Sequence, residues 1–185
     1  MKNSKAIWTV KTECGPIREK NEDAIYPDKS GSSNLPIIAG IFDGMGGHKK
    51  GEVASRIASK VMDDNLVKIS DYVNLANKNI LDYQNKHPEA TGMGTTMTIV
   101  EIDQEKVLHL AHVGDSRCYV LNNRNLIQLT KDENVPGFQN VLTQALGSKE
   151  KLKIQTKDFQ LTSGDVVFLC TDGVYNEIGD VYLKN

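Results

Sequence analysis

Alternating and continuous apolar runs predict two strands in the first third of the chain. Residues 6–13 (AIWTVKTE) alternate between apolar and polar side chains, which is the pattern of a half-buried strand. Residues 35–43 (LPIIAGIFD) form a continuous apolar run, which is typical of a strand buried on both faces. Residues 26–34 (YPDKSGSSN) are rich in proline, glycine and serine, so we expect a loop between the two strands.

The next part of the chain has helical periodicity. Apolar residues recur every three or four positions from Gly51 to about Ile69, which predicts an amphipathic helix. Ser70 has a side chain suited to the N-cap of a second amphipathic helix. We expect that helix to end at His87, because a residue before proline disfavours helical backbone angles.

The rest of the chain is predicted to be β-structure. Six short segments have an alternating or apolar pattern: residues 95–102, 106–114, 116–122, 126–130, 153–161 and 165–172. Residues 122–125 (NNRN) are typical of a hairpin turn. Because strands and helices are grouped, the pattern favours an α+β fold with antiparallel sheets over a doubly wound fold. With no internal repeat or linker, we expect residues 1–185 to form a single domain.

Composition narrows the class of protein. Hydrophobic residues make up 39% of the chain and charged residues 25%, as in soluble globular proteins. The net charge of −2 argues against a nucleic-acid-binding surface, which needs a basic excess. Three cysteines without a CxxC pair indicate reduced thiols. Because the sequence has neither a signal peptide nor a membrane-spanning apolar run, we expect a cytoplasmic location and no membrane association.

Acidic residues stand where predicted strands end, each beside a glycine: Asp43, Asp115 and Asp172. Further upstream, the segment REKNED adds Glu22 and Asp23. One Asp-Gly pair is typical of a turn, but three at strand ends suggest a shared site. Clustered carboxylates raise one another's pKa unless a cation lies among them. An all-oxygen ligand set suits Mg²⁺ or Mn²⁺ better than zinc.

Two other phosphate chemistries fit the sequence less well. Gly46 and Gly51 have the spacing of a P-loop, but the lysines precede the second glycine and no serine or threonine follows it. Cys118 and Arg124 have the Cys-x5-Arg spacing of cysteine-based phosphatases. The residues between them (YVLNN) are typical of a strand entering a turn, so we interpret Cys118 as a small buried apolar residue.

Seven motifs together resemble the metal-dependent serine/threonine phosphatases of the PP2C family, particularly the short bacterial members. In order, they are REKNED (18–23), FDGMGGHKKGEVAS (42–55), GMGTTMT (92–98), AHVGDSRCYVL (111–121), LTKDE (129–133), NVLTQALG (140–147) and DVVFLCTDGV (165–174). The resemblance implies a β-sandwich of two antiparallel sheets flanked by α-helices, with a binuclear metal site at one end. It also implies hydrolysis of phosphoserine and phosphothreonine in proteins by water that the metals activate.

The resemblance assigns five residues to the two metals, which we expect to be Mn²⁺ or Mg²⁺. Asp43 would bridge both ions, and Gly44 would contribute its carbonyl oxygen. Glu22 would ligate the second metal directly or through water, with Asp23 supporting it. Asp172 would ligate the first metal. The implied partners are phosphorylated protein substrates, together with a cognate serine/threonine kinase and its targets.

Asp115 and Arg18 complete the implied site, and His48 is a further candidate. Asp115 would belong to a third, weaker metal site. Arg18 would bind the substrate phosphate, because a guanidinium presents a planar fork to two oxygens. His48 is a candidate general acid, but eukaryotic relatives carry the acid histidine where this chain has Met45. We therefore interpret His48 as a loop or helix-start residue.

Two departures from the family pattern bear on activity. Only residues 134–139 (NVPGFQ) connect two motifs between which family members usually carry a longer flap, so we expect a more open site. No Gly-x-Asp-Asn occurs, although its aspartate completes the family's binuclear site, and the context of Asp180 does not suit that role. The alternative function is therefore a catalytically weak or dead module that binds phosphoproteins or regulates a partner. We expect a monomer unless an exposed C-terminal sheet edge pairs with another chain.

Overall fold

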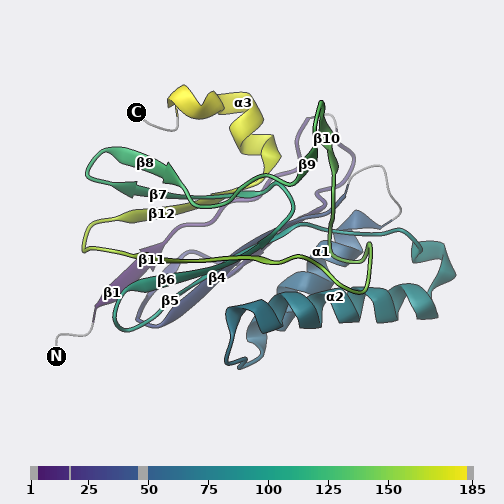
Figure 1. Ribbon diagram of the computed structural model, residues 1–185, viewed down its shortest axis with the longest axis horizontal. Coiled ribbons are helices and arrows are strands. Elements are labelled where there is room, and N and C mark those ends of the chain that lie inside the picture. The colour runs from purple at the N-terminus through teal and green to yellow at the C-terminus, as the bar shows by residue number, and fades with distance from the viewer. Residues whose placement is uncertain (1–3, 17, 46–49, 183–185) are drawn as a thin grey trace.

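Two antiparallel sheets packed face to face form the centre of the fold in the computed structural model, which describes residues 4–16, 18–45 and 50–182 (Figure 1). The larger sheet has the strand order β11-β6-β5-β4-β2. Its strands are β2 (Asp23–Tyr26), β4 (Ile37–Asp43), β5 (Met97–Ile102), β6 (Val107–Val113) and β11 (Gln155–Gln160). The smaller sheet has the order β12-β7-β8. Its strands are β7 (Arg117–Asn122), β8 (Asn125–Gln128) and β12 (Val166–Cys170).

Alternation along the central strands divides the apolar residues between two cores. On β5, Met97 and Ile99 face the helices, whereas Val100 packs into the cluster between the two sheets. β6 follows the same rule, with Leu110 facing the smaller sheet and Ala111 facing the helices. Because side chains alternate between the faces of a strand, one sheet serves both cores.

Helices α1 (Gly51–Lys60) and α2 (Ile69–Lys86) cover the outer face of the larger sheet. They lie side by side beneath it in Figure 1, with α1 against β2 and β4 and α2 against β5 and β6. A 3₁₀ turn, η1 (Val61–Asp63), follows α1, and another, η2 (Pro88–Ala90), follows α2. The third helix, α3 (Asp172–Tyr182), lies apart from these two, beside the smaller sheet.

The prediction of a loop over residues 26–34 is wrong, because part of this segment is a strand. β3 (Gly31–Asn34) pairs with β1 (Lys5–Trp8) as a separate two-stranded ribbon. A Cβ atom on Gly31 would lie 2.8 Å from the indole of Trp8, so the missing side chain lets the ring lie across β3. The strand predicted over residues 6–13 correspondingly ends at Trp8.

The predicted boundary between the two helices also needs correction. The helix expected to reach Ile69 ends at Lys60, and α2 begins at Ile69 without a side-chain N-cap from Ser70. The connection is instead held by Tyr72 on α2. Its hydroxyl donates to the carbonyl of Asp64 at 2.8 Å and accepts from the amide of Leu66 at 3.2 Å. Packing of the connection against α2 therefore overrides the periodic pattern.

The short connection at residues 134–139 forms part of a hairpin between β9 (Asn134–Val135) and β10 (Phe138–Leu142). This hairpin projects from one end of the sandwich, where the loop between β6 and β7 also lies (Figure 1). The side chain of Phe138 on the hairpin is 65% exposed.

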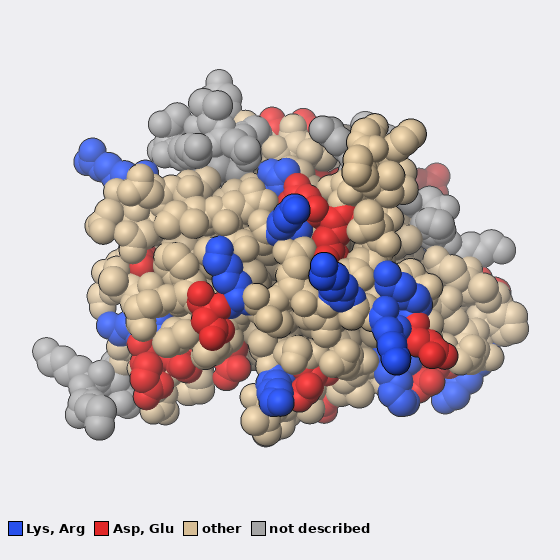
Figure 2. All heavy atoms as spheres, in the orientation of Figure 1, with Lys and Arg blue, Asp and Glu red and all other residues tan. Residues whose placement is uncertain are grey.

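Basic and acidic side chains are intermixed on the face of the molecule shown in Figure 2, separated by uncharged surface. This face therefore carries no broad basic patch of the kind that nucleic-acid binding requires. None of the helices within the described ranges is both long enough and apolar enough to cross a membrane.

Candidate active site

The pairing of β2 with β4 brings two of the predicted carboxylates together. Asp23 is the first residue of β2 and Asp43 the last of β4, and the antiparallel register places them opposite each other. Each of the two carboxyl groups affects the pKa of the other. The amide of Asp43 lies 3.0 Å from Oγ1 of Thr96, and its carbonyl accepts from Oγ1 of Thr95 at 2.9 Å. The backbone of Asp43 is thus fixed by its neighbours on the following motif.

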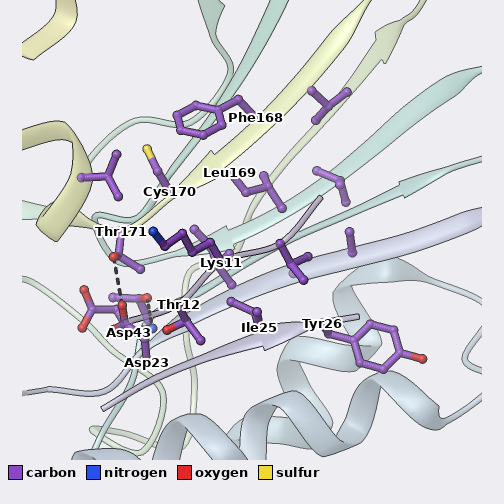
Figure 3. Close-up of a pocket in the computed structure, with 18 of the residues that line it drawn as sticks. Lys11, Thr12, Asp23, Ile25, Tyr26, Asp43, Phe168, Leu169, Cys170 and Thr171 are labelled. Atoms are coloured by element: carbon purple, nitrogen blue, oxygen red, sulfur yellow. Dashed lines mark hydrogen bonds between the residues drawn. The ribbon is translucent and has the colours of Figure 1, made fainter. Parts of the chain in front are cut away.

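Asp172 and Asp115 reach the same place from other elements. Asp172 begins α3, and the preceding Thr171 donates from Oγ1 to Oδ2 of Asp23 at 3.1 Å (Figure 3). Asp115 lies in the turn between β6 and β7, where Oδ2 accepts from Nδ2 of Asn134 at 2.9 Å. All four aspartates line one cavity of about 1530 Å³. The structure therefore gathers carboxylates that the sequence places up to 149 residues apart.

Burial and mutual repulsion change the protonation of this cluster. Burial, followed by the charges of Asp23, Asp172 and Asp115, raises the pKa of Asp43 to about 9. The pKa values of Asp23 and Asp115 are also raised, mainly because these side chains are buried. A cation among these oxygens would relieve the repulsion, so the electrostatics fit the expected divalent metal.

Glycine at position 44 allows three backbone segments to approach one another. A Cβ atom there would lie 2.5 Å from the carbonyl oxygens of Glu22 and Gly51. The amide of Gly44 donates to the carbonyl of Glu22 at 3.1 Å, and Oγ of Ser55 donates to the same carbonyl at 2.6 Å. The backbone of Glu22 is therefore held between the end of β4 and the first turns of α1.

Arg18 lies beside Glu22 at the edge of the cavity. Its Nη1 atom is 4.0 Å from Oε2 of Glu22, and its side chain is 63% exposed. This loose ion pair leaves most of the guanidinium accessible to an incoming anion. His48, the candidate acid, lies outside the described residues.

The carboxylates are near neighbours but are not drawn into a closed ligand set. Within residues 4–16, 18–45 and 50–182, no three histidine, cysteine, aspartate or glutamate side chains are grouped so that they could hold one ion. The cluster consists of Asp23 and Asp43, which lie opposite each other, with Asp172 and Asp115 close enough to raise the pKa of Asp43. Its oxygen chemistry and its crowding fit a divalent cation, whereas the spacing of its side chains is open.

Sequence reasoning missed the residues that support the turn containing Asp115. Glu133 accepts from the amide of Gly114 at 2.9 Å, and its own amide donates to the carbonyl of Gly114 at 2.9 Å. The adjacent Asn134 donates to Asp115, as described above. The motif LTKDE (129–133) is part of the family resemblance. Its sequence, a strand followed by charged residues, does not indicate which turn those charged residues contact.

The environment of Cys118 supports its interpretation as an apolar residue. The side chain is fully buried on β7, and burial raises the pKa of its thiol to about 12. A protonated thiol without solvent access is unsuited to nucleophilic attack. Arg124 lies in the turn between β7 and β8, where Asn123 and Arg124 have φ values of 46° and 69°. The predicted hairpin turn at residues 122–125 is thus confirmed.

Two bacterial phosphatases are similar in sequence to most of this chain. The serine/threonine phosphatase stp of Listeria monocytogenes is 30% identical over 206 residues, which cover 94% of this chain and 80% of that protein. The protein phosphatase PhpP of Streptococcus pneumoniae is 29% identical, over 94% of this chain and 81% of that protein. Both alignments therefore extend over nearly the whole chain.

Solved structures with the same arrangement of elements include the Mycobacterium tuberculosis serine/threonine phosphatase PstP/Ppp. That structure matches with a TM-score of 0.81 and 26% identity over 98% of this chain and 83% of that one. The catalytic domain of PstP in complex with two manganese ions matches with a TM-score of 0.80, again at 26% identity, over 98% and 82% of the two chains. Residues 18–183 match the protein phosphatase 2C family. The α+β sandwich and the resemblance read from the motifs are therefore confirmed, and the chain belongs to the protein phosphatase 2C family.

Proposed function

We propose that the protein is a Mn²⁺- or Mg²⁺-dependent phosphatase that hydrolyses phosphoserine and phosphothreonine in proteins. Its family membership and its likeness to named serine/threonine phosphatases support this activity. The single observation that carries the metal dependence is that four aspartates line one cavity, where burial and then the charges of Asp23, Asp172 and Asp115 raise the pKa of Asp43 to about 9. A serine/threonine kinase that phosphorylates the same proteins is the partner that such an activity implies.

The residues around Asp43 would hold two divalent cations. Asp43, the Gly44 carbonyl, Glu22 and Asp172 would hold them, with Asp23 supporting Glu22. Asp115, supported by Asn134, would contribute to a third, weaker site. Bound divalent cations supply a water of lowered pKa as nucleophile and neutralise phosphate charge. The carboxylates would hold these cations in a fixed position at the end of the sandwich.

Arg18 would orient the substrate phosphate. Its side chain is largely exposed, and its ion pair with Glu22 is long, so the guanidinium can turn toward the phosphate oxygens. Direct attack by water needs no covalent intermediate with the protein. The buried and protonated thiol of Cys118 is consistent with that route.

Replacing Asp43 by asparagine tests this proposal. We expect Asp43→Asn to lower the Mn²⁺-dependent hydrolysis of p-nitrophenyl phosphate and of a phosphothreonine peptide by at least about 100-fold, as losses of metal ligation do. Asp82→Asn is a matched control, because Asp82 is an exposed aspartate on α2 that pairs with Lys78. Equal rates for wild type and Asp43→Asn would contradict the proposal, as would hydrolysis that does not depend on Mn²⁺.

A second candidate function is a catalytically weak or dead module that binds phosphoproteins or regulates a partner. The open spacing of the carboxylates within the described residues favours it. Calorimetry with Mn²⁺ discriminates between the two functions. Binding in the micromolar range supports the enzyme, whereas no binding at millimolar Mn²⁺ supports the module and contradicts metal-dependent catalysis.

A further inference from the structure

Arg117 and Tyr175 connect the two segments that carry Asp115 and Asp172. Arg117 begins β7, two residues after Asp115, and Tyr175 lies on α3, three residues after Asp172. The Cζ atom of Arg117 lies 3.6 Å from the centroid of the Tyr175 ring, which is a close cation–π contact. The hydroxyl of Tyr175 donates to the carbonyl of Asp115 at 3.2 Å. These two contacts join the turn to the helix directly.

The guanidinium of Arg117 is held in one plane by its other partners. Its Nε atom donates to Oδ1 of Asp132 at 3.1 Å and its Nη2 atom donates to Oδ2 at 2.7 Å, while Nη1 donates to the hydroxyl of Tyr119 at 3.0 Å. Only 18% of the Arg117 side chain is exposed. A two-pronged pair with a carboxylate fixes orientation as well as position. Arg117 therefore offers the Tyr175 ring a rigid surface.

The contacts of Tyr175 also fix the orientation of Asp172. Residues three apart lie on the same side of a helix, so a fixed Tyr175 also fixes the direction in which the first turn of α3 faces. Tyr175 is 8% exposed and packs in a small cluster with Tyr119 and Cys170. On the other side of the helix start, Thr171 donates to Asp23. The first turn of α3 is thus attached at two points, one toward Asp115 and one toward Asp23.

We propose that Arg117 and Tyr175 are positioning residues that set the separation between Asp115 and Asp172 and thereby the affinity for the divalent metal. The inference deepens the proposed function and rests on it, because it concerns the divalent cations that Asp172 and Asp115 would help to hold. Neither residue touches the reacting atoms. Both act through the backbone of Asp115 and the first turn of α3.

The test measures Mn²⁺ affinity by calorimetry, together with the melting temperature, in the full chain. Tyr175→Phe keeps the ring over Arg117 and removes only the hydroxyl that bonds to Asp115. We expect it to lower the Mn²⁺ affinity of the weakest site that calorimetry detects by about 10-fold. This is the lower end of the loss caused by removing a residue that supports a metal ligand. Tyr72→Phe is the matched control, because Tyr72 is similarly buried and donates to a backbone carbonyl far from the carboxylates. We expect Tyr72→Phe to lower the melting temperature without changing Mn²⁺ affinity.

A double-mutant cycle shows whether the effect passes through Asp172. We expect Tyr175→Phe to weaken Mn²⁺ binding about 10-fold in the wild-type background and less than about 2-fold when Asp172→Asn is already present. Arg117→Lys keeps the charge but loses the planar surface, and it should weaken Mn²⁺ binding in the same way as Tyr175→Phe.

Three results would overturn the inference. One is an unchanged Mn²⁺ affinity in Tyr175→Phe, and another is an equal loss in Tyr72→Phe. The third is full additivity of Tyr175→Phe with Asp172→Asn. Each of these contradicts positioning while leaving the phosphatase proposal intact. Absence of Mn²⁺ binding by the wild type would overturn both, so the two failures are distinguishable.

Discussion

Among the single residues, Asp43 combines a partly buried position with three acidic neighbours, Asp23, Asp172 and Asp115. Its backbone is fixed by Thr95 and Thr96, so the side chain cannot withdraw into solvent without disturbing the end of β4. A protein tolerates such a group when ligand binding compensates for the cost of repulsion. The cluster should therefore destabilise the fold in the absence of metal and stabilise it in the presence of metal.

Replacing Asp43 should consequently have opposite effects on stability in the two conditions. Without metal near neutral pH, we expect Asp43→Asn to raise the free energy of unfolding by about 1–3 kcal/mol, because Asp43, with its pKa raised to about 9, must take up a proton on folding, whereas an amide is neutral in both states. With saturating Mn²⁺, the wild type should become the more stable protein, because only a protein that binds the ion gains stability from it. Urea unfolding with EDTA or with Mn²⁺ measures both values. The same order of stability in both conditions would contradict this account.

The sequence predicts only some of the residues of the candidate site. Asp43, Asp115 and Asp172 could be selected because each ends an apolar run beside a glycine. The requirement for glycine at position 44 also follows from the structure, since a Cβ there would overlap the backbone at Glu22 and Gly51. The contact of Arg117 with Tyr175 could not be predicted, because it depends on how α3 packs against a strand 58 positions earlier. No local pattern marks either residue.

Among the larger elements, the sequence predicted the central strands and β1, but it did not predict β3 or the hairpin of β9 and β10. β5 and β6 read as largely apolar runs because each separates two apolar cores. β3 reads Gly-Ser-Ser-Asn, so its pairing with β1 leaves no apolar pattern to detect. β9 and β10 form a short and irregular hairpin that a loop composition conceals. The strands that the sequence did not predict are therefore those that bury little apolar surface.

The pairing of β6 with β11 contains an ionic contact that depends on pH. His109 on β6 lies opposite Asp158 on β11, and its Nδ1 atom is 2.8 Å from Oδ1 of that aspartate. Its Nε2 atom is 3.2 Å from Oδ2 of Asp103. The hydrogen bond to Asp158, followed by that to Asp103, raises the pKa of His109 above its usual value near 6.5. The protonated imidazole is therefore favoured in the folded state.

His109→Gln should lower stability in acid more than in base. A raised folded-state pKa contributes stability that is fully present below about pH 6.5, the unfolded value, and is lost as the pH rises through the folded value. We expect a lower melting temperature than the wild type at pH 5.5–6 and a smaller difference at pH 9. Asp158→Asn, which removes the main partner, should show the same trend. A difference in melting temperature that does not change with pH would contradict this prediction.

At the scale of the whole molecule, the cavity continues from the carboxylates along the space between the sheets. Ile25, Leu169 and Phe168 line it beyond Asp23 and Asp43 (Figure 3). Among the described strands, β12 pairs only with β7 and forms one border of the smaller sheet. Val166 and Phe168 on this border are 54% and 36% exposed. An exposed apolar sheet edge is prone to pair with another chain.

This edge should make the protein associate as its concentration rises. We expect sedimentation velocity to shift toward a larger species between about 10 μM and 500 μM, because unpaired backbone groups of β12 can pair with a second copy. Val166→Lys should suppress the shift by placing a charge at the edge. Val67→Lys should leave the shift unchanged, because Val67 is a 93% exposed valine in the connection before α2. A wild type that sediments identically at every concentration would contradict the prediction.

The hydrogen bond between Thr171 and Asp23 spans 148 positions of the chain. The carboxylate cluster therefore cannot assemble from any short stretch of the polypeptide. During synthesis, a nascent chain would expose Asp23, Asp43 and Asp115 long before Asp172 leaves the ribosome. Because domains generally complete their packing as units, the cluster would come together late, when the start of α3 docks. Phosphate-ester hydrolysis by this protein would thus begin only after nearly all of these residues have been translated.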